Sequence, residues 1–220
     1  MKELAIVLPT YNEAKNLPIL INKIDEFLKE KPWVIVVDDN SPDGTGILAE
    51  GLAKKRGKML VIHRKEKLGL GSAYLEAFKL VLEKIPCEFI VTMDSDLSHH
   101  PYYIKKFLER DEDLIIGSRY IKGGYAYFNI RRRIVSLIAN FLARRLLRLK
   151  VKDCTNGFRA YKVKALKILM KFKFKAKGYF FQIEILKLAN KIKLKIFEYP
   201  IIFYTREEGK SKLNFKEILN

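Results

Sequence analysis

Long apolar runs and cysteines are both scarce in this sequence, and each scarcity excludes a class of protein. No stretch reaches the roughly 18–20 uninterrupted apolar residues that a membrane-spanning helix needs, and residues 1–8 are too short and too strand-like for a signal peptide. The 220 residues include two cysteines, Cys87 and Cys154, far apart and without metal-site spacing. We therefore expect reduced thiols in a cytosolic protein that has neither a disulfide framework nor a spanning helix.

Acidic residues are also few: 25 Asp and Glu stand against 43 Lys and Arg, which leaves a formal net charge of +18. Such an excess is typical of a protein that meets nucleic acid, an anionic membrane surface or a phosphorylated substrate. A charged surface of the hyperthermophile kind is an alternative, although it accounts for lysines better than for clustered arginines.

Strand and helix patterns alternate along the chain, and hydrophobic residues make up 49% of it, enough for a sizeable core. The expected strands are 3–9, 33–39, 59–63, 88–94, 113–120 and 194–204, and the expected helices are 14–30, 46–56, 70–84, 130–151 and 179–191, with mixed structure over 157–175. Because most of these strands are continuously apolar, the pattern predicts an α/β fold with a single, mostly parallel sheet flanked by helices. No repeat or low-complexity linker divides the chain, so we expect one domain over 1–220.

Polar side chains follow three of these strands at the point where each strand ends. The first strand ends in PTYNE (9–13), the second in Asp38 and Asp39, and the fourth in Asp94 and Asp96. Ligands of an open parallel sheet bind at the carboxyl ends of the strands, so these groups are expected to share a cleft. Two carboxylates one residue apart suit Mg²⁺ or Mn²⁺, whose oxygen shell is completed by water and substrate phosphates.

Residues beside this Asp-x-Asp pair have simpler interpretations that stay open. Asp96 can instead cap a helix that begins near Pro101. His99 and His100 are adjacent on an expected loop and do not face one point, so we expect them to support the site rather than bind a metal.

Eight stretches of the sequence, which together span nearly the whole chain in order, match one known family. They are LPTYNE (8–13), VVDDNSPDGT (36–45), MDSDLSHHP (93–101), GSRY (117–120), RRRIVSLIAN (131–140), TNGFRAYK (155–162), GYFFQIE (178–184) and PIIFYTREEGKSKLN (200–214). The chain resembles the family 2 glycosyltransferases, and within them the dolichol-phosphate mannose synthases. The resemblance implies a GT-A fold with a nucleotide-binding half (1–120) and an acceptor-binding half (121–220). It also implies metal-dependent, inverting transfer of mannose from GDP-mannose to dolichyl or polyprenyl phosphate, giving dolichyl phosphate mannose.

The resemblance also implies roles for individual positions. The nucleotide base and ribose would be contacted by Pro9, Tyr11, Glu13, Asp38 and Asp39, and the metal and diphosphate would be faced by Asp94 and Asp96. The acceptor phosphate would be held by Arg119, Arg132 and Ser136, and a loop carrying Arg206 and Lys212 would lie over the diphosphate. Some family members supply a third metal ligand where this chain has Ser98.

A phosphate acceptor makes a catalytic base unnecessary. A phosphate monoester is largely ionised near pH 7, because its second pKa is about 6, whereas a sugar hydroxyl must be deprotonated as it attacks. Many related transferases carry an acidic base in the region of FFQIE (180–184), where this chain offers Gln182, which cannot take a proton, and Glu184, which we interpret as an ordinary helix residue.

The basic helix over 131–149 is the best candidate for contact with a membrane. Its expected apolar stripe comprises Ile134, Leu137, Ile138, Phe141, Leu142 and Leu149, and its positive charge comes from Arg131, Arg132, Arg133, Arg144, Arg145 and Arg148. This composition is typical of an interfacial helix on anionic lipid, which would make the protein peripheral at the cytoplasmic face of the membrane. A core-facing helix with solvated arginines is the alternative, and a small membrane partner protein could share the anchoring.

Three other functions compete with this interpretation. A polyprenyl-phosphate glucosyl- or aminosugar transferase of the same fold differs only in its sugar. A nucleic-acid-binding protein is suggested by charge alone, and acidic strand ends argue against it because carboxylates repel a phosphate backbone. A sugar nucleotidyltransferase usually opens with a Gly-rich basic loop, which PTYNE (9–13) lacks. We therefore expect no nucleic-acid partner.

Overall fold

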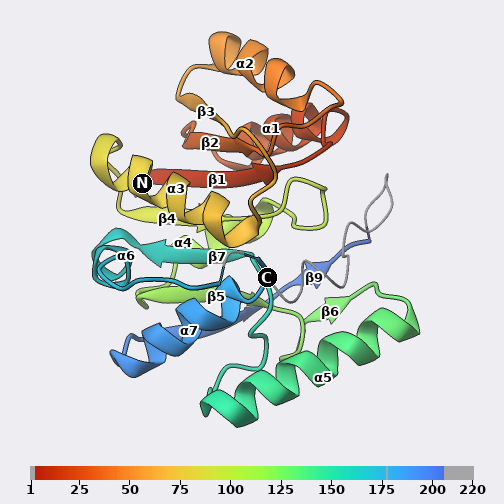
Figure 1. Ribbon diagram of the computed structural model, residues 1–220, viewed down its shortest axis with the longest axis vertical. Coiled ribbons are helices and arrows are strands. Elements are labelled where there is room, and N and C mark those ends of the chain that lie inside the picture. Colours follow the sequence, from red (N-terminus) through yellow and green to blue (C-terminus); the bar gives the residue numbers. More distant parts are fainter. Residues whose placement is uncertain (1–2, 177, 206–220) are drawn as a thin grey trace.

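A seven-stranded sheet runs through the middle of the protein in the order β3-β2-β1-β4-β7-β5-β8 (Figure 1). The computed structural model describes residues 3–176 and 178–205. The strands of this sheet are β1 (Leu4–Thr10), β2 (Trp33–Asp38), β3 (Met59–His63), β4 (Phe89–Thr92), β5 (Leu114–Ser118), β7 (Arg159–Lys162) and β8 (Ile196–Pro200). Only β7 runs antiparallel to its neighbours, β4 and β5, so the mostly parallel sheet predicted from the sequence is confirmed.

Helices cover both faces of the sheet. They are α1 (Asn16–Phe27), α2 (Thr45–Arg56), α3 (Leu70–Lys84), α4 (Tyr102–Leu108), α5 (Ile130–Leu147), α6 (Val163–Leu169) and α7 (Phe181–Lys191). Side chains alternate along each strand, so Ala5 and Val7 of β1 pack in one core with α3 and α7. Leu4 and Ile6 face the opposite core, with α1 and α4. The continuous apolar runs of the sequence are therefore strands buried on both sides.

The C-terminal half contributes strands to the same sheet as the N-terminal half. The segment 157–175, expected to be mixed, supplies β7, which lies between β4 and β5, and then α6. The expected strand 194–204 is divided at the buried Ile201 into β8 and β9 (Ile202–Phe203). Strand β9 pairs with the short β6 (Tyr125–Ala126) in a separate two-stranded sheet.

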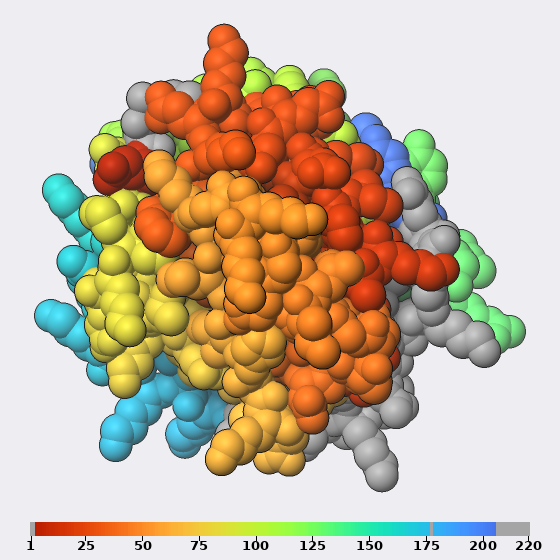
Figure 2. Space-filling view, turned by 90° about the horizontal axis from the view of Figure 1, so that it is seen from above, coloured from red at the N-terminus to blue at the C-terminus, as the bar shows by residue number. Residues whose placement is uncertain are grey.

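Helix α5 lies along one end of the molecule, away from α1 and α2 (Figure 1). It ends at Leu147 rather than near residue 151, because Arg148 adopts a left-handed conformation with φ of 50°. Figure 2 looks onto the opposite end, where residues of the first half form the surface and the second half appears only at the margins. Among the described residues, no helix combines the length and apolar character needed to cross a membrane.

Candidate active site

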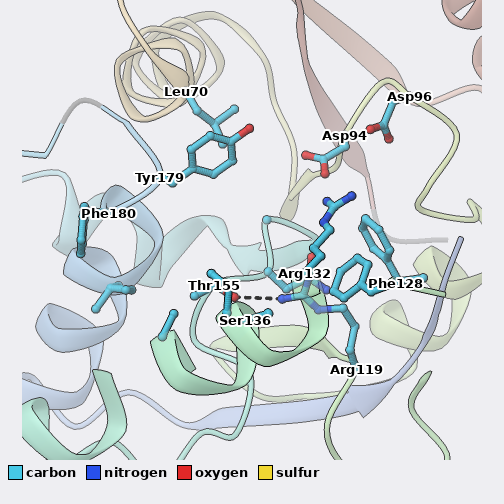
Figure 3. Close-up of a pocket in the computed structure, with 16 residues that line it drawn as sticks. Leu70, Asp94, Asp96, Arg119, Phe128, Arg132, Ser136, Thr155, Tyr179 and Phe180 are labelled. Atoms are coloured by element: carbon cyan, nitrogen blue, oxygen red, sulfur yellow. Dashed lines mark hydrogen bonds between the residues drawn. The ribbon is translucent and has the colours of Figure 1, made fainter. Parts of the chain in front are cut away.

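A cavity of about 210 Å³ lies between the carboxyl end of β4 and the helices α5 and α7 (Figure 3). It is lined by Leu70, Asp94, Asp96, Arg119, Phe128, Arg132, Val135, Ser136, Ala139, Thr155, Asn156, Gly157, Tyr179, Phe180, Ile183 and Phe203. The structure thus brings together five residues that the sequence placed at a metal and acceptor site: two aspartates, two arginines and Ser136. Their shared cavity puts carboxylates opposite guanidinium groups, with apolar side chains along the rest of the wall.

Asp94 and Asp96 sit on the loop that follows β4, and local hydrogen bonds fix both. One carboxylate oxygen of Asp96, Oδ1, accepts hydrogen bonds from the Ser98 hydroxyl and from the Ser98 backbone N–H, the latter at 3.1 Å. Asp96 does not cap the following helix, since α4 begins at Tyr102 and has no side-chain cap; that alternative interpretation is wrong. Ser98, at the position where some family members have a third ligand, instead orients Asp96.

His99 joins the Asp94 loop to the segment before β7. Its Nδ1 accepts a hydrogen bond of 3.0 Å from the backbone N–H of Asp94, and its Nε2 lies 3.0 Å from Asn156 Oδ1. The Asn156 amide nitrogen donates to Gly117 O, which leaves its oxygen facing the histidine. His99 must therefore carry its proton on Nε2. The buried His99 ring therefore positions the Asp94 loop. His100 is not part of this connection: its Nδ1 accepts a hydrogen bond from the backbone N–H of Tyr102.

Arg119 is held in a buried ion pair. Its Nε and Nη2 donate to the two carboxylate oxygens of Asp153 at 2.7 and 2.8 Å, and Nη2 also donates to Thr155 Oγ1 at 2.9 Å. Burial opposes charge on both partners, but their mutual attraction outweighs it, so the pKa of Arg119 is raised and that of Asp153 is lowered. Because Asp153 balances this positive charge, Arg119 is less available to an acceptor phosphate than the sequence implied.

Arg132 points from the first turn of α5 towards Asp94 and Asp96 (Figure 3). Its guanidinium carbon lies 4.4 Å from the centre of the Phe128 ring, and Asn129 caps the helix by accepting the Arg132 backbone N–H. Arg131 and Arg133 are exposed, so among the three consecutive arginines only Arg132 lines the cavity.

Ser136 lies one turn further along α5. Its hydroxyl oxygen accepts a hydrogen bond of 2.6 Å from the Tyr120 hydroxyl.

The residues expected to contact the nucleotide lie at the neighbouring strand ends rather than in this cavity. Pro9 accepts a hydrogen bond of 2.8 Å from Ser95 Oγ, which ties the end of β1 to the Asp94 loop. Glu13 is buried, and its carboxylate accepts from Asn16 Nδ2 at 2.8 Å. The Tyr11 ring lies 4.7 Å from Lys67 Nζ.

The adjacent aspartates at the end of β2 differ in their surroundings. Asp38 accepts hydrogen bonds from Thr10 Oγ1, Ser41 N–H and Ser41 Oγ, so its carboxylate shapes the loop. Asp39 forms an ion pair of 2.6 Å with Arg64. Burial raises the pKa of Asp39 to about 6, even though the nearby Arg64 and Lys67 act to lower it.

Sequence reasoning missed several residues that build this site. Asp153, Asn156, Arg64, Phe128 and Tyr179 were not singled out, although Asn156 lies inside the TNGFRAYK stretch. Three of these residues have partners 25 to 57 positions away, in the pairs Arg64–Asp39, Arg119–Asp153 and His99–Asn156. Such pairings leave no local pattern in the sequence. Arg206 and Lys212 fall outside the described residues.

The FFQIE stretch offers no poised base. Both carboxylate oxygens of Glu184 accept backbone N–H groups, from Lys175 and Ala176, at 2.9 to 3.1 Å. Gln182 is buried and cannot ionise.

The metal-binding potential rests on the aspartate pair. Within residues 3–176 and 178–205, no group of three or more His, Cys, Asp and Glu side chains could hold a metal ion. Two carboxylates facing one cavity nevertheless fit a hard divalent cation whose remaining ligands are water and substrate phosphates.

Known proteins match both the sequence and the fold. The family model for glycosyl transferase family 2 matches residues 5–169. An undecaprenyl-phosphate mannosyltransferase of Micrococcus luteus is 37% identical over 211 residues, covering 94% of this chain and 86% of that protein. A polyprenol monophosphomannose synthase of Mycolicibacterium smegmatis is 38% identical over 218 residues, covering 97% of this chain and 82% of that protein.

Among solved structures, glucosyl-3-phosphoglycerate synthase of Mycobacterium tuberculosis, crystallised with Mn²⁺, UDP and glucosyl-3-phosphoglycerate, has a similar fold. The TM-score is 0.68 at 20% identity, covering 99% of this chain and 75% of that one. At this identity the likeness establishes the GT-A-like architecture alone. The match of the family model over most of the chain, together with the two relatives, shows that this chain is an enzyme of glycosyl transferase family 2.

Proposed function

We propose that the protein transfers mannose from GDP-mannose to a polyprenyl phosphate, such as dolichyl phosphate, with inversion at the sugar carbon. The observation that carries the proposal is the cavity in which Asp94 and Asp96 lie opposite Arg132. In such an arrangement a metal-bound diphosphate would lie at the aspartates and a second phosphate at the arginine. The names of the two relatives, each similar along almost the whole chain, support mannose as the sugar and a polyprenyl phosphate as the acceptor.

Asp94 and Asp96 would hold Mg²⁺ or Mn²⁺, with the donor diphosphate completing the oxygen shell. The bound metal would neutralise charge on the diphosphate as it leaves the sugar. The chain's own contribution is orientation. Ser98 fixes one oxygen of Asp96, and His99 fixes the backbone at Asp94.

Arg132 is the residue best placed to bring the acceptor phosphate to the sugar. A guanidinium stays charged and binds phosphate oxygens in a bidentate manner. Arg119, balanced by Asp153, supports the neighbouring wall, and Ser136 extends the polar side of α5. Since the acceptor arrives ionised, these residues need only align it with the sugar carbon, which agrees with the engaged carboxylate of Glu184.

The exposed face of α5 supports a peripheral position at an anionic membrane surface. Eight of its apolar side chains are at least 45% exposed: Ile130, Ile134, Val135, Leu137, Ile138, Phe141, Leu142 and Leu146. Only Asn140 and Ala143 of α5 are buried. The expected stripe is corrected at one position, since Leu149 is buried and lies beyond the helix end. An amphipathic helix with this apolar face and flanking arginines suits the headgroup region of a bilayer, and a partner membrane protein could add to the anchoring.

A transfer assay tests the proposal against the same-fold alternatives. Purified protein is incubated with Mn²⁺ or Mg²⁺, a short polyprenyl phosphate, and labelled GDP-mannose, UDP-glucose or UDP-N-acetylglucosamine. We expect label in the lipid phase from GDP-mannose. Lipid product from UDP-glucose alone would indicate a glucosyltransferase instead. Lipid product from UDP-N-acetylglucosamine alone would indicate an aminosugar transferase.

Asp96→Asn tests the metal part of the proposal. The amide oxygen still accepts the hydrogen bonds from Ser98, so the loop should keep its shape while one metal-binding charge is lost. We expect transfer to fall by roughly 10²-fold or more, with an unchanged melting temperature. Full activity of this variant, or of the wild type in excess chelator, would remove the metal from the mechanism.

A further inference from the structure

A group of buried polar atoms lies behind Gly157, on the Asp94 side of the cavity. Gly157 lines the cavity, and its carbonyl oxygen accepts a hydrogen bond of 2.6 Å from Thr92 Oγ1, which fixes the backbone there. A Cβ atom added to Gly157 would meet Tyr74 Oη at 3.3 Å, Gln182 Nε2 at 3.4 Å and Asp94 Oδ1 at 3.6 Å. Polar atoms from α3, α7 and the loop after β4 therefore converge on one point.

Two of these side chains have hydrogen-bonding capacity that no described residue uses. Tyr74 is completely buried and Gln182 is 1% exposed. Within residues 3–176 and 178–205, the Tyr74 hydroxyl and both polar atoms of the Gln182 amide have no hydrogen-bond partner. Unpaired buried polar groups are costly, and native proteins satisfy the great majority of them.

We propose that the space between Tyr74, Gln182 and Asp94, next to Gly157, binds one hydroxyl-type oxygen, supplied either by a hydroxyl of the transferred sugar or by an ordered water. Such an oxygen can accept hydrogen bonds from Tyr74 Oη and Gln182 Nε2 while donating one to Asp94 Oδ1. A phosphate or carboxylate oxygen does not fit, because it has no hydrogen to donate to Asp94. The distances of 3.3 to 3.6 Å start from the position of an added Cβ, which is too close to Gly157 Cα for a free oxygen. The bound oxygen would therefore sit further out, among the three polar atoms, at hydrogen-bonding distance from each.

This inference rests on the proposed function and adds a role to it. An oxygen in this space links the buried core to the carboxylate that faces the metal. If the oxygen belongs to the sugar, Tyr74 and Gln182 select the donor. If it belongs to water, they hold Asp94 in the orientation that the metal requires. In both cases Gly157 is needed because a methyl group there would press against the same three polar atoms and exclude the oxygen.

The test compares three variants with a matched control. Tyr74→Phe removes one hydroxyl, Gln182→Leu removes the amide, and Gly157→Ala adds the excluding methyl group. Tyr161→Phe removes another buried hydroxyl of the same core, one that is not among the three atoms nearest the point. We expect kcat/KM for GDP-mannose to fall by about 10- to 100-fold in the three variants and by less than about threefold in the control.

Donors that lack one hydroxyl distinguish the two sources of the oxygen. If the sugar supplies it, one deoxy-mannose donor reacts as poorly with the wild type as GDP-mannose does with Tyr74→Phe, and the two losses do not add. If water supplies it, Tyr74→Phe slows every donor by the same factor and weakens Mn²⁺-dependent binding of GDP. Both results support the site.

Wild-type kinetics in both Tyr74→Phe and Gly157→Ala would overturn the inference while leaving the proposed function standing. These are the smallest changes, so they decide the matter even if Gln182→Leu fails to fold. A wild-type protein that makes no lipid product from GDP-mannose would instead overturn the proposed function. Mn²⁺-dependent binding of GDP-mannose and UDP-glucose to the same variants would then test the site: weaker binding supports it, and unchanged binding removes it.

Discussion

Among the arginines of this protein, position in the structure decides which side chain can serve a substrate. Arg119 donates two hydrogen bonds to Asp153, whereas Arg132 points into the cavity towards Asp94 and Asp96 (Figure 3). Arg131 is its neighbour in sequence but is exposed. Of the three consecutive arginines 131–133, only Arg132 therefore has access to the cavity.

Arg132→Gln should therefore weaken use of the acceptor. Loss of a charge-assisted phosphate contact costs about 1.5–3 kcal/mol, which corresponds to a KM for polyprenyl phosphate raised by about 10- to 100-fold. Arg131→Gln is the matched control and should stay near the wild type. Steady-state kinetics at saturating GDP-mannose measure both. Equal effects in the two variants would mean that only the overall charge of α5 matters.

Asp39 should make donor binding depend on pH. Burial raises its pKa to about 6, and we expect the nucleotide to bind the ionised carboxylate. Affinity should then be constant above pH 7 and fall about tenfold by pH 5, as the carboxylate becomes protonated. Calorimetric titration with GDP-mannose is suitable, because its diphosphate has no ionisation near pH 6.

Asp39→Asn is the control for that titration. It should bind the donor weakly at pH 7 and show a flat profile between pH 5 and 7. A variant that keeps the wild-type pH profile would assign the titration to another group.

At the scale of single elements, α5 has two faces with different tasks. Its inner side is fastened by Asn140, which accepts a hydrogen bond from the backbone N–H of Cys154 and donates to Ser136 O and Thr155 Oγ1. Its outer side leaves large apolar residues exposed, a feature that marks interaction surfaces. The same helix therefore connects the cavity with a surface suited to lipid.

Replacing Ile138 and Phe141 with aspartate should release the protein from anionic vesicles. These side chains are 54% and 62% exposed, so the change should remove membrane contacts without unfolding the protein. Ile47→Asp on α2, where the side chain is 81% exposed, is the matched control at the opposite end of the molecule (Figure 1). Vesicle co-sedimentation at low and high salt measures binding. Failure of the wild type to sediment at low salt would mean that α5 does not anchor the protein.

For the whole molecule, local patterns predicted most of the elements and the fold class, but not β6, β7 or α6 and not the order of strands in the sheet. The expected ranges 59–63 and 70–84 coincide with β3 and α3, because apolar spacing reports local burial. Strand β7 is only four residues long and half charged, and its place between β4 and β5 depends on contacts distant in sequence. No local pattern contains that information.

The residues of the site were likewise predictable where a local pattern marks them and not where their role depends on a distant partner. Asp94 and Asp96 could be identified because they follow a buried strand, and strand ends meet at one edge of a parallel sheet. Asp153 could not, because its importance comes from Arg119, 34 positions away. The mostly parallel α/β sheet therefore follows from local patterns, whereas the balance of charge around the cavity appears only in the folded protein.

The central claim is that the protein transfers mannose to a polyprenyl phosphate, and the most direct test is to identify the lipid product that it makes at a membrane. Purified protein, Mn²⁺ and GDP-mannose are added to anionic vesicles that contain polyprenyl phosphate, and the extracted lipid is analysed by mass spectrometry and NMR. The account predicts a mannosyl phosphate lipid whose sugar is β-linked, because an ionised phosphate attacks the α-linked donor from the opposite face. Free mannose without a lipid product, or an α-linked lipid, would contradict it.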